Sequence, residues 1–134
     1  MAEEKRMTET MAQMRDTCES IRDTLNAFYE GKIYDTVECA MVEMPDDFDE
    51  NCERYSSLYE WLLCDNLGVK ITTDINGEDL YGCQICVGWG GPNIYIDTND
   101  KAVTGYWWTE RWETPLTGEV CDMIDEIVDE ARRC

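Results

Sequence analysis

The sequence predicts an α+β protein with N-terminal helices, a four-stranded antiparallel sheet and a C-terminal amphipathic helix. Three patterns support this order. Apolar residues recur at helical spacing as far as about residue 66, alternate with polar residues from residue 69, and return to helical spacing after residue 117. We interpret 1–134 as a single domain, with a helical part over 1–68 and a β-meander plus a helix over 69–134.

A long first helix is expected over about residues 4–30. Its apolar positions follow a 4-3-4-3-4-3 spacing, an a/d heptad stripe formed by Met7, Met11, Met14, Cys18, Ile21, Leu25 and Phe28. Gly31 stands where a left-handed residue would end the helix. The stripe over 7–28 either packs on the rest of the chain or forms a homodimer. Its short length favours packing within the chain.

Two more helices are expected before the sheet. The first covers 33–44, where the apolar spacing fits a helix face, although the Val and Ile content would also fit a strand. Pro45 would end it. The second covers 48–66, and Gly68 follows its end. Its apolar residues repeat at 4-3-4-3 spacing and are Phe48, Cys52, Tyr55, Tyr59 and Leu62.

The pattern changes at residue 69 to one that is typical of strands. Val69, Ile71 and Thr73 alternate with polar residues, and Asn76-Gly77 predicts a hairpin turn. Further strands are expected over residues 81–88, 93–98 and 102–109, with a polar turn at 99–101 between the last two. Pro115 would end this four-stranded meander.

The expected final helix, 118–132, is two-faced, and Thr117 is placed to cap it. One side is apolar, with Val120, Ile124, Ile127 and Ala131. The other side carries six carboxylates, Glu119, Asp122, Asp125, Glu126, Asp129 and Glu130. No basic residue occurs between Arg111 and Arg132, whereas a solvated helix usually intersperses both signs of charge. We take this side as a candidate partner-binding face, with an ordinary solvated face as the open alternative.

Charge is the strongest compositional signal. The chain has 30 Asp and Glu against 11 Lys and Arg, a net charge of −19, and no histidine. A second stretch without Lys or Arg spans Asp35–Glu53, and we include its Asp46, Asp47, Asp49 and Glu50 among the candidate contacts. Such a surface repels nucleic acid and anionic membranes and attracts proteins that bind phosphates. The expected partner is therefore a basic nucleic-acid-binding protein. We expect the chain itself to bind neither nucleic acid nor a membrane.

The N-terminus lacks the apolar region of a secretory signal, and no apolar run is long enough to span a membrane. We therefore expect the protein in the cytoplasm of its host cell. Reduced thiols are then the default, and most of the eight cysteines are expected to be small core residues. Cys52 and Cys134 are the expected exceptions, exposed to solvent.

Catalytic and metal-binding patterns are weak. Without histidine, no Ser or Cys triad can form. Cys83 and Cys86 form one C-x-x-C, but in a strand their thiols would point to opposite faces, which disfavours zinc. The run that starts at Asp47 has Cys52 where a calcium loop requires glycine. We expect no metal, no cofactor and no enzyme activity. Paired catalytic carboxylates, such as those of glycoside hydrolases, cannot be recognised or excluded by spacing, because carboxylates occur throughout this chain.

Aromatic residues cluster between Tyr106 and Trp112. Consecutive strand residues face opposite sides, so Trp107 and Trp108 cannot both be core residues of a one-sided sheet. One of them should be exposed or covered by the first helix. Exposed tryptophans often anchor protein interfaces, and we take Trp108 and Trp112 as candidate anchors.

The segments 90–98, 105–108, 115–116 and 121–127 together resemble small acidic accessory proteins of phages, plasmids and conjugative elements of Gram-positive bacteria. The resemblance covers about residues 90–130 and assigns no functional residue. Several such proteins are anti-CRISPR or antirestriction factors. The resemblance therefore implies that the protein comes from a mobile genetic element and acts against host defence.

Charge and resemblance together lead to one expectation. The protein would be a non-enzymatic, anti-CRISPR-like inhibitor of a bacterial nuclease, and its partner could be a Cas effector nuclease. It would act as an acidic mimic of nucleic acid on a basic DNA- or RNA-binding surface. Two alternatives stay open: an accessory enzyme that acts on nucleic acid through carboxylates or thiols, and an acidic interaction module unrelated to defence.

Overall fold

The computed structural model of the chain describes residues 8–49, 52–64, 66–89 and 91–133. The first helix, α1, covers Glu9–Tyr29. A small sheet of order β2-β1-β3 and a short π-helix follow: β1 Ile33–Asp35, β2 Ala40–Val42, β3 Tyr55–Ser56 and η1 Glu60–Cys64. A larger sheet and the last helix complete the chain: β4 Gly68–Thr73, β5 Leu80–Gly88, β6 Asn93–Asp97, β7 Ala102–Trp107, β8 Glu110–Pro115 and α2 Gly118–Arg132.

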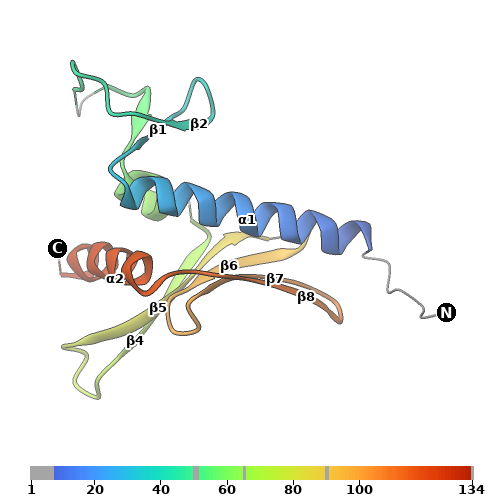
Figure 1. Cartoon of the computed structure of the whole chain (residues 1–134). Helices are drawn as coiled ribbons and strands as arrows, with labels where there is room; N and C mark the ends of the chain where they lie inside the picture. The colour runs from blue at the N-terminus through green and yellow to red at the C-terminus, as the bar shows by residue number, and fades with distance from the viewer. Residues whose placement is uncertain (1–7, 50–51, 65, 90, 134) are drawn as a thin grey trace.

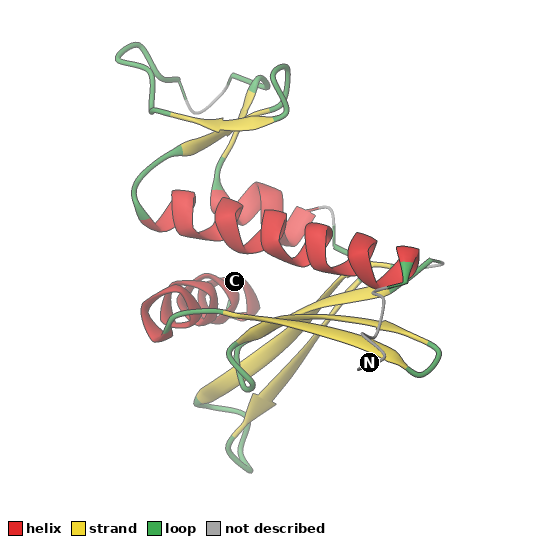
Figure 2. Ribbon diagram, turned by 45° about the vertical axis from the view of Figure 1, so that its right-hand side comes forward, coloured by secondary structure: helices red, strands yellow, loops and turns green. Residues whose placement is uncertain are grey.

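The two long helices cover one face of the large sheet (Figures 1 and 2). Their apolar residues join those of one sheet face in a single core, which includes Met14, Leu25, Ile85, Ile96 and Ile124. No helix of the described residues lies over the opposite face (Figures 1 and 2). The α+β class, the N- and C-terminal helices and the antiparallel meander are confirmed. The large sheet has five strands in the order β4-β5-β6-β7-β8, so the prediction of four is wrong. Among the described residues, no helix has the length and apolarity to cross a membrane.

Helix α1 ends where Gly31 predicts, but it begins at Glu9, later than the predicted start at about residue 4. The Thr8 hydroxyl accepts a hydrogen bond from the Met11 amide at 3.0 Å and caps the N-terminus. Gly31 adopts a φ of 93°, and the amides of Gly31 and Lys32 donate to the carbonyls of Phe28 and Ala27, each at 3.0 Å. These two bonds form a Schellman motif, in which glycine avoids the cost of the left-handed conformation.

The apolar stripe of α1 packs on the chain's own sheet. Met14, Cys18 and Leu25 are at most 1% exposed, and Met7 lies outside the described residues. A Cβ added to Gly105 of β7 would come within 3.0 Å of the Met14 sulfur, so the missing side chain lets helix and strand approach closely. The stripe therefore packs within the chain, as favoured above. This packing buries the helix face that a homodimer through 7–28 would use.

The predicted helix over residues 33–44 is wrong, because this segment forms the β1–β2 hairpin. The Asp35 carboxylate accepts hydrogen bonds from the amides of Val37 and Glu38 at 2.9 and 3.2 Å, which turns the chain. Cys39 then has a φ of 54°, which an α-helix does not allow. The segment contains the apolar spacing of a helix, but local turn chemistry determines its structure.

The predicted helix over residues 48–66 is wrong in its first part, because Tyr55 and Ser56 form a strand and, among the described residues, only 58–64 are helical. Arg54 reaches the buried Asp35 carboxylate, with its Nη2 atom 2.9 Å from Oδ2, and this contact aligns Tyr55 and Ser56 as strand β3 beside β1. A helical turn begins only after Ser57, whose hydroxyl and amide exchange hydrogen bonds with Glu60 in a capping box. That Ser-x-x-Glu signal lies within the predicted helix and marks its true start.

The fourth predicted strand, over residues 102–109, is too long. The chain reverses at Trp108 and Thr109, and β8 returns beside β7 with Trp107 opposite Glu110. Trp108 has a φ of 57° at this turn. Bulky residues seldom adopt this conformation. The turn also lacks the usual Asn-Gly signal for a hairpin, so the local sequence does not predict it. The other turns lie where the pattern predicts, with Gly77 at a φ of 73° between β4 and β5.

We expect Met14→Ala to lower the free energy of unfolding by about 2–5 kcal/mol, because it leaves a cavity between α1 and β7. Met44→Ala is the matched control, since that side chain is 46% exposed. Its cost should be below about 0.5 kcal/mol. Urea denaturation followed by circular dichroism measures both values. Equal costs for the two variants would contradict the packing of α1 described above.

The small sheet should loosen in acid. The Arg54 hydrogen bonds are the main cause that lowers the pKa of Asp35 below its ordinary value. An unfolded aspartate has a pKa of about 3.9. The stabilising contribution is therefore complete above that pH and is lost as the pH falls through the lower, folded value. Hydrogen exchange of the Tyr34 and Met41 amides as a function of pH measures the stability of the small sheet. Asp35→Asn should abolish this acid-dependent step, and a step that persists would assign it to other carboxylates.

Candidate partner-binding surface

Helix α2 positions the carboxylates that the sequence singles out. The Thr117 hydroxyl accepts a hydrogen bond from the Val120 amide at 3.2 Å and begins the helix. Val120, Cys121, Ile124 and Val128 are buried against the sheet. Burial of this stripe sets the rotation of the helix, so the opposite side faces solvent.

Four of the six predicted carboxylates are exposed, namely Glu119, Asp122, Glu126 and Glu130. Their spacing of three, four and four residues places them in one row along the helix. Successive members are separated by about 4.5 to 6 Å along the axis. Glu119, Asp122 and Glu126 form no ion pair or hydrogen bond with the described residues, so the start of the row is uncompensated.

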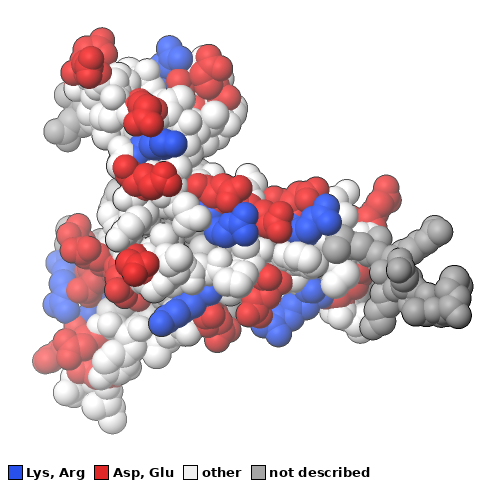
Figure 3. All heavy atoms as spheres, in the orientation of Figure 1, with Lys and Arg blue, Asp and Glu red and all other residues white. Residues whose placement is uncertain are grey.

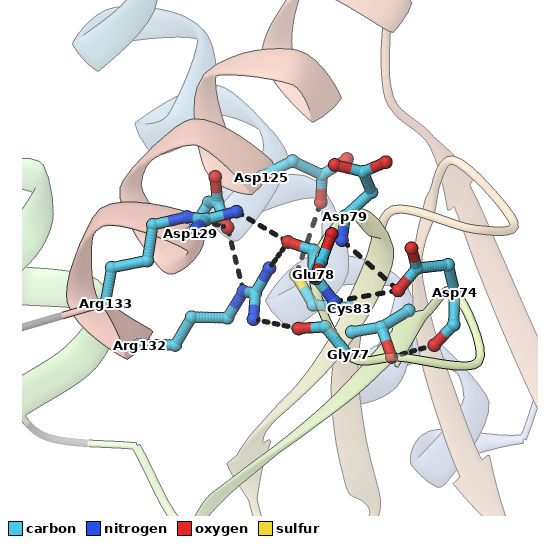
Figure 4. Close-up of polar contacts among 10 residues, drawn as sticks. Asp74, Gly77, Glu78, Asp79, Cys83, Asp125, Asp129, Arg132 and Arg133 are labelled. Atoms are coloured by element: carbon cyan, nitrogen blue, oxygen red, sulfur yellow. Dashed lines mark hydrogen bonds and ion pairs between the residues drawn. The ribbon is translucent and has the colours of Figure 1, made fainter.

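Asp125 points inward. Its Oδ1 atom accepts a hydrogen bond from the Thr98 hydroxyl at 2.6 Å. It also accepts one from the Cys83 thiol at 3.5 Å (Figure 4). Thr98 also accepts a hydrogen bond from the Cys83 amide at 2.8 Å. The half-buried Asp125 carboxylate thus joins α2 to β5 and to the turn after β6. This role holds the helix in position and leaves little of the carboxylate for a partner.

Asp129 is also used within the chain. Arg132 and Arg133 contact its Oδ1 atom through their Nε atoms, at 2.8 and 3.1 Å. Arg132 also donates to the Gly77 carbonyl at 2.9 Å and thereby connects α2 to the β4–β5 hairpin (Figure 4). Burial raises the pKa of Asp129, but the hydrogen bonds from Arg133 and Arg132 outweigh it, so the pKa lies below its ordinary value.

An acidic groove lies between α2 and the beginning of β5. It has a volume of about 520 Å³ and is lined by Leu80, Tyr81, Asp122, Asp125, Glu126 and Asp129. The exposed Glu78 and Asp79 belong to the hairpin beside it. The Asp74 carboxylate accepts hydrogen bonds from the amides of both residues, at 2.7 and 3.4 Å, and so shapes the hairpin tip. Helix and hairpin together present carboxylates to one region of the surface.

The described arginines do little to neutralise this surface, because each is paired with a carboxylate. Every described arginine contacts a carboxylate: Arg15 with Asp16, Arg22 with Asp23, Arg54 with Asp35, Arg111 with Glu113, and Arg132 and Arg133 with Asp129. In Figure 3, red Asp and Glu atoms cover more of the visible surface than blue Lys and Arg atoms. These six arginines use only five carboxylates, because Arg132 and Arg133 share Asp129, so a large excess of carboxylates remains unpaired with arginine.

The second acidic stretch lies apart from α2, in the loop between β2 and β3. Asp46, Asp47 and Asp49 are exposed there, and Glu50 lies outside the described residues. The small sheet that carries this loop lies beyond the C-terminal end of α1, away from the large sheet (Figures 1 and 2). The two predicted acidic regions therefore do not form one continuous surface with each other.

The two candidate tryptophans differ in exposure. Trp108 is 88% exposed at the β7–β8 turn, and Trp107 is half-buried against the core, so the expected division between them is confirmed. Trp112 is half-buried as well and donates from Nε1 to the Thr114 hydroxyl at 3.0 Å. Strand β8 separates Trp108 from the start of α2 by its six residues, about 20 Å. Trp108 is thus a surface aromatic remote from the acidic helix.

The cysteines divide into exposed and buried groups. Cys39, Cys52 and Cys64 are exposed, Cys86 is half-buried, and Cys18, Cys83 and Cys121 are buried. The expectation that most are core residues is therefore too broad, and Cys134 lies outside the described residues. Cys83 and Cys86 face opposite sides of the sheet, as the strand pattern predicts. Among the described residues, no three His, Cys, Asp or Glu side chains are grouped to hold a metal ion.

Burial keeps the core thiols protonated. It raises the pKa of Cys83 to about 12 and is the main cause that raises those of Cys18 and Cys121 to about 11. Only the thiolate is a nucleophile, so these three cysteines are inert at neutral pH.

Comparison with known proteins identifies no relative: no family model, no curated protein and no solved structure matches this chain.

We expect alkylation at pH 8 to divide the thiols into the same groups. Cys39, Cys52 and Cys64 should react first and Cys86 more slowly. Cys18, Cys83 and Cys121 should react only after unfolding, because they are inaccessible and protonated. Mass spectrometry of peptides alkylated for increasing times measures each rate. Rapid alkylation of Cys83 in folded protein would contradict the contact between α2 and β5.

Proposed function

We propose that this protein is a non-enzymatic inhibitor of a bacterial nucleic-acid-targeting nuclease, and that it acts as an acidic mimic of nucleic acid. The observation that carries the proposal is the uncompensated row of Glu119, Asp122 and Glu126 on the exposed side of α2. Its partner is a basic DNA- or RNA-binding surface, for which a Cas effector nuclease is the leading candidate. Inhibition follows because protein and nucleic acid compete for that surface.

The charge spacing supports mimicry. The row carries one negative charge per about 4.5 to 6 Å of helix axis. One strand of duplex DNA carries one per about 3.4 Å. The helix therefore presents a similar, slightly sparser line of negative charge. Carboxylates accept bidentate hydrogen bonds from arginine, as phosphates do, so the same guanidinium groups can bind either surface.

Rigidity supports it further. Asp125 and Asp129 hold α2 against the sheet and the β4–β5 hairpin, so the helix that carries the row is already in place when a partner arrives. A preformed surface loses less conformational entropy on binding. We therefore assign contact to the exposed row and a positioning role to Asp125 and Asp129. Asp46, Asp47 and Trp108 would contact a partner only where it extends well beyond α2.

The resemblance of about residues 90–130 to accessory proteins of mobile elements supports the choice of a defence nuclease as target. Such a protein would act in the cytoplasm of the host bacterium. The protonated core thiols argue against the alternative of an enzyme that uses those cysteines. An acidic interaction module without a role in defence would share the same surface but would not block nucleic-acid loading.

The order of addition tests this proposal. Purified protein mixed first with a candidate Cas nuclease should block guide or target binding at low salt, and nuclease preloaded with nucleic acid should be protected. Inhibition should weaken steeply as salt rises, because binding releases counterions. Gel-shift and cleavage assays measure both effects. Inhibition indifferent to order and to salt would indicate an allosteric binder, and cleavage of nucleic acid by this chain alone would indicate an enzyme.

Charge reversal tests the face. The triple variant Glu119→Lys, Asp122→Lys, Glu126→Lys should weaken inhibition at least about tenfold, a loss of about 1.4 kcal/mol in binding. The control variant Glu30→Lys, Glu53→Lys, Asp100→Lys has the same net charge, with changes at exposed sites elsewhere. It should inhibit nearly as well as the natural protein. Equal losses in the two folded variants would show that total charge matters and the α2 row does not.

A further inference from the structure

The uncovered face of the large sheet contains a pocket of about 570 Å³. Side chains alternate between faces along a strand. Because Ile85 and Ile96 point into the core, their neighbours Gln84, Cys86 and Tyr95 point to the opposite face. These residues line the pocket together with Leu67, Gly68, Val69, Lys70 and Trp89. The volume is within the usual range of small-molecule sites, about 300–1,000 Å³.

A β-bulge directs Trp89 to this face. The β5–β6 register shifts between Cys86 and Gly88, so that Gly88 lies opposite the core residue Ile94. In a regular strand Trp89 would share the core face with Ile85. The extra residue reverses the alternation, and Trp89 projects from the outer face beside Tyr95, where it is 70% exposed. Bulges often redirect a side chain beside a binding site.

Two polar side chains complete the pocket. Lys70 lies opposite Gln84 in the β4–β5 register. Lys70 has no hydrogen bond or ion pair with the described residues, although carboxylates greatly outnumber cations in this chain. The Gln84 amide nitrogen donates to the Asp97 carboxylate at 3.3 Å, and Asp97 is only 9% exposed. This bond orients the amide, so its carbonyl oxygen and second N–H can meet a ligand.

We propose that this pocket binds a free mononucleotide. The base would stack between Trp89 and Tyr95, Gln84 would pair with a donor–acceptor edge of the base, and the Lys70 ammonium would bind the phosphate. Each group matches one part of that ligand: a planar ring, a hydrogen-bonding edge and an anion. The site uses the opposite face of the sheet from α2, so it stands independently of the proposed inhibition.

The rest of the molecule favours a single nucleotide over a strand. A ligand that carries one phosphate group meets the cation of Lys70, whereas each further phosphate approaches a chain of net charge −19. Affinity should therefore fall, or fail to rise, as nucleotides are added. A nucleic-acid-binding sheet would show the reverse trend, with affinity growing with length.

Binding of UMP, CMP, GMP and AMP to the full chain is the direct test, by calorimetry and tryptophan fluorescence. At least one should bind with a Kd below about 1 mM. Its nucleoside should bind at least about fivefold more weakly, and inorganic phosphate should not compete at equal concentration. No binding by any of the four, or equal binding of nucleotide and nucleoside, would overturn the proposal. Tighter binding of a short oligonucleotide would also overturn it, in favour of a strand-binding face.

Variants locate the site. Trp89→Ala and Lys70→Met should each weaken binding at least about tenfold, and Lys70→Arg should restore much of it. Trp108→Ala is the matched control, because that tryptophan is also exposed but lies outside the pocket. The ligand should also slow alkylation of Cys86 and leave Cys39 and Cys64 unaffected. An equal effect of Trp89→Ala and Trp108→Ala, or no protection of Cys86, would overturn this placement.

Discussion

The packing of α1 across β7 and β8 is the contact on which the rest of the structure depends. Met14 lies over Gly105, and the same helix face carries Cys18 and Leu25 into the core. Burial of each large side chain contributes about 1.5–3 kcal/mol. The end of α1 then determines where the small sheet begins, because the chain turns at Gly31, and Phe28 packs against Trp61 with ring centroids 5.7 Å apart. Helix, large sheet and small sheet are thus joined through one apolar stripe.

Electrostatics imposes the second constraint. A chain of net charge −19 loses stability through self-repulsion. Several arginines offset this by pairing with carboxylates and backbone carbonyls that join separate elements of the fold. Arg54 holds β3 beside β1, while Arg132 and Arg133 hold α2 to the β4–β5 hairpin. Because these arginines serve contacts within the fold, they leave the outer side of α2 negative. The uncovered sheet face differs, because it has an aromatic pocket lined in part by Lys70, which forms no ion pair with the described part of the chain. The molecule therefore offers two chemically distinct surfaces.

The candidate site shows how packing refines a residue list. Six carboxylates of α2 look equivalent in sequence, but the Thr98 hydroxyl and the arginines engage Asp125 and Asp129. Both partners of Asp125, Thr98 and Cys83, are distant in sequence, so no local pattern reveals the contact. The pocket around Trp89 is missed for a similar reason. The orientation of the Trp89 side chain depends on a β-bulge, and a bulge exists only as a shift of register between two paired strands.

Local pattern was sufficient for α1, α2 and the strands between residues 68 and 107, because each has a periodic stripe long enough to identify its type and caps that mark its ends. Thr117, Gly31 and Gly77 act where their side-chain chemistry predicts. Residues 33–56 were different. Their apolar spacing fits a helix, yet the buried Asp35 and Arg54, 19 residues apart, align short strands instead. Strand β8 was likewise hidden, since its turn places Trp108 at a positive φ. Local periodicity describes a segment on its own, whereas these elements form only through partners that folding brings together.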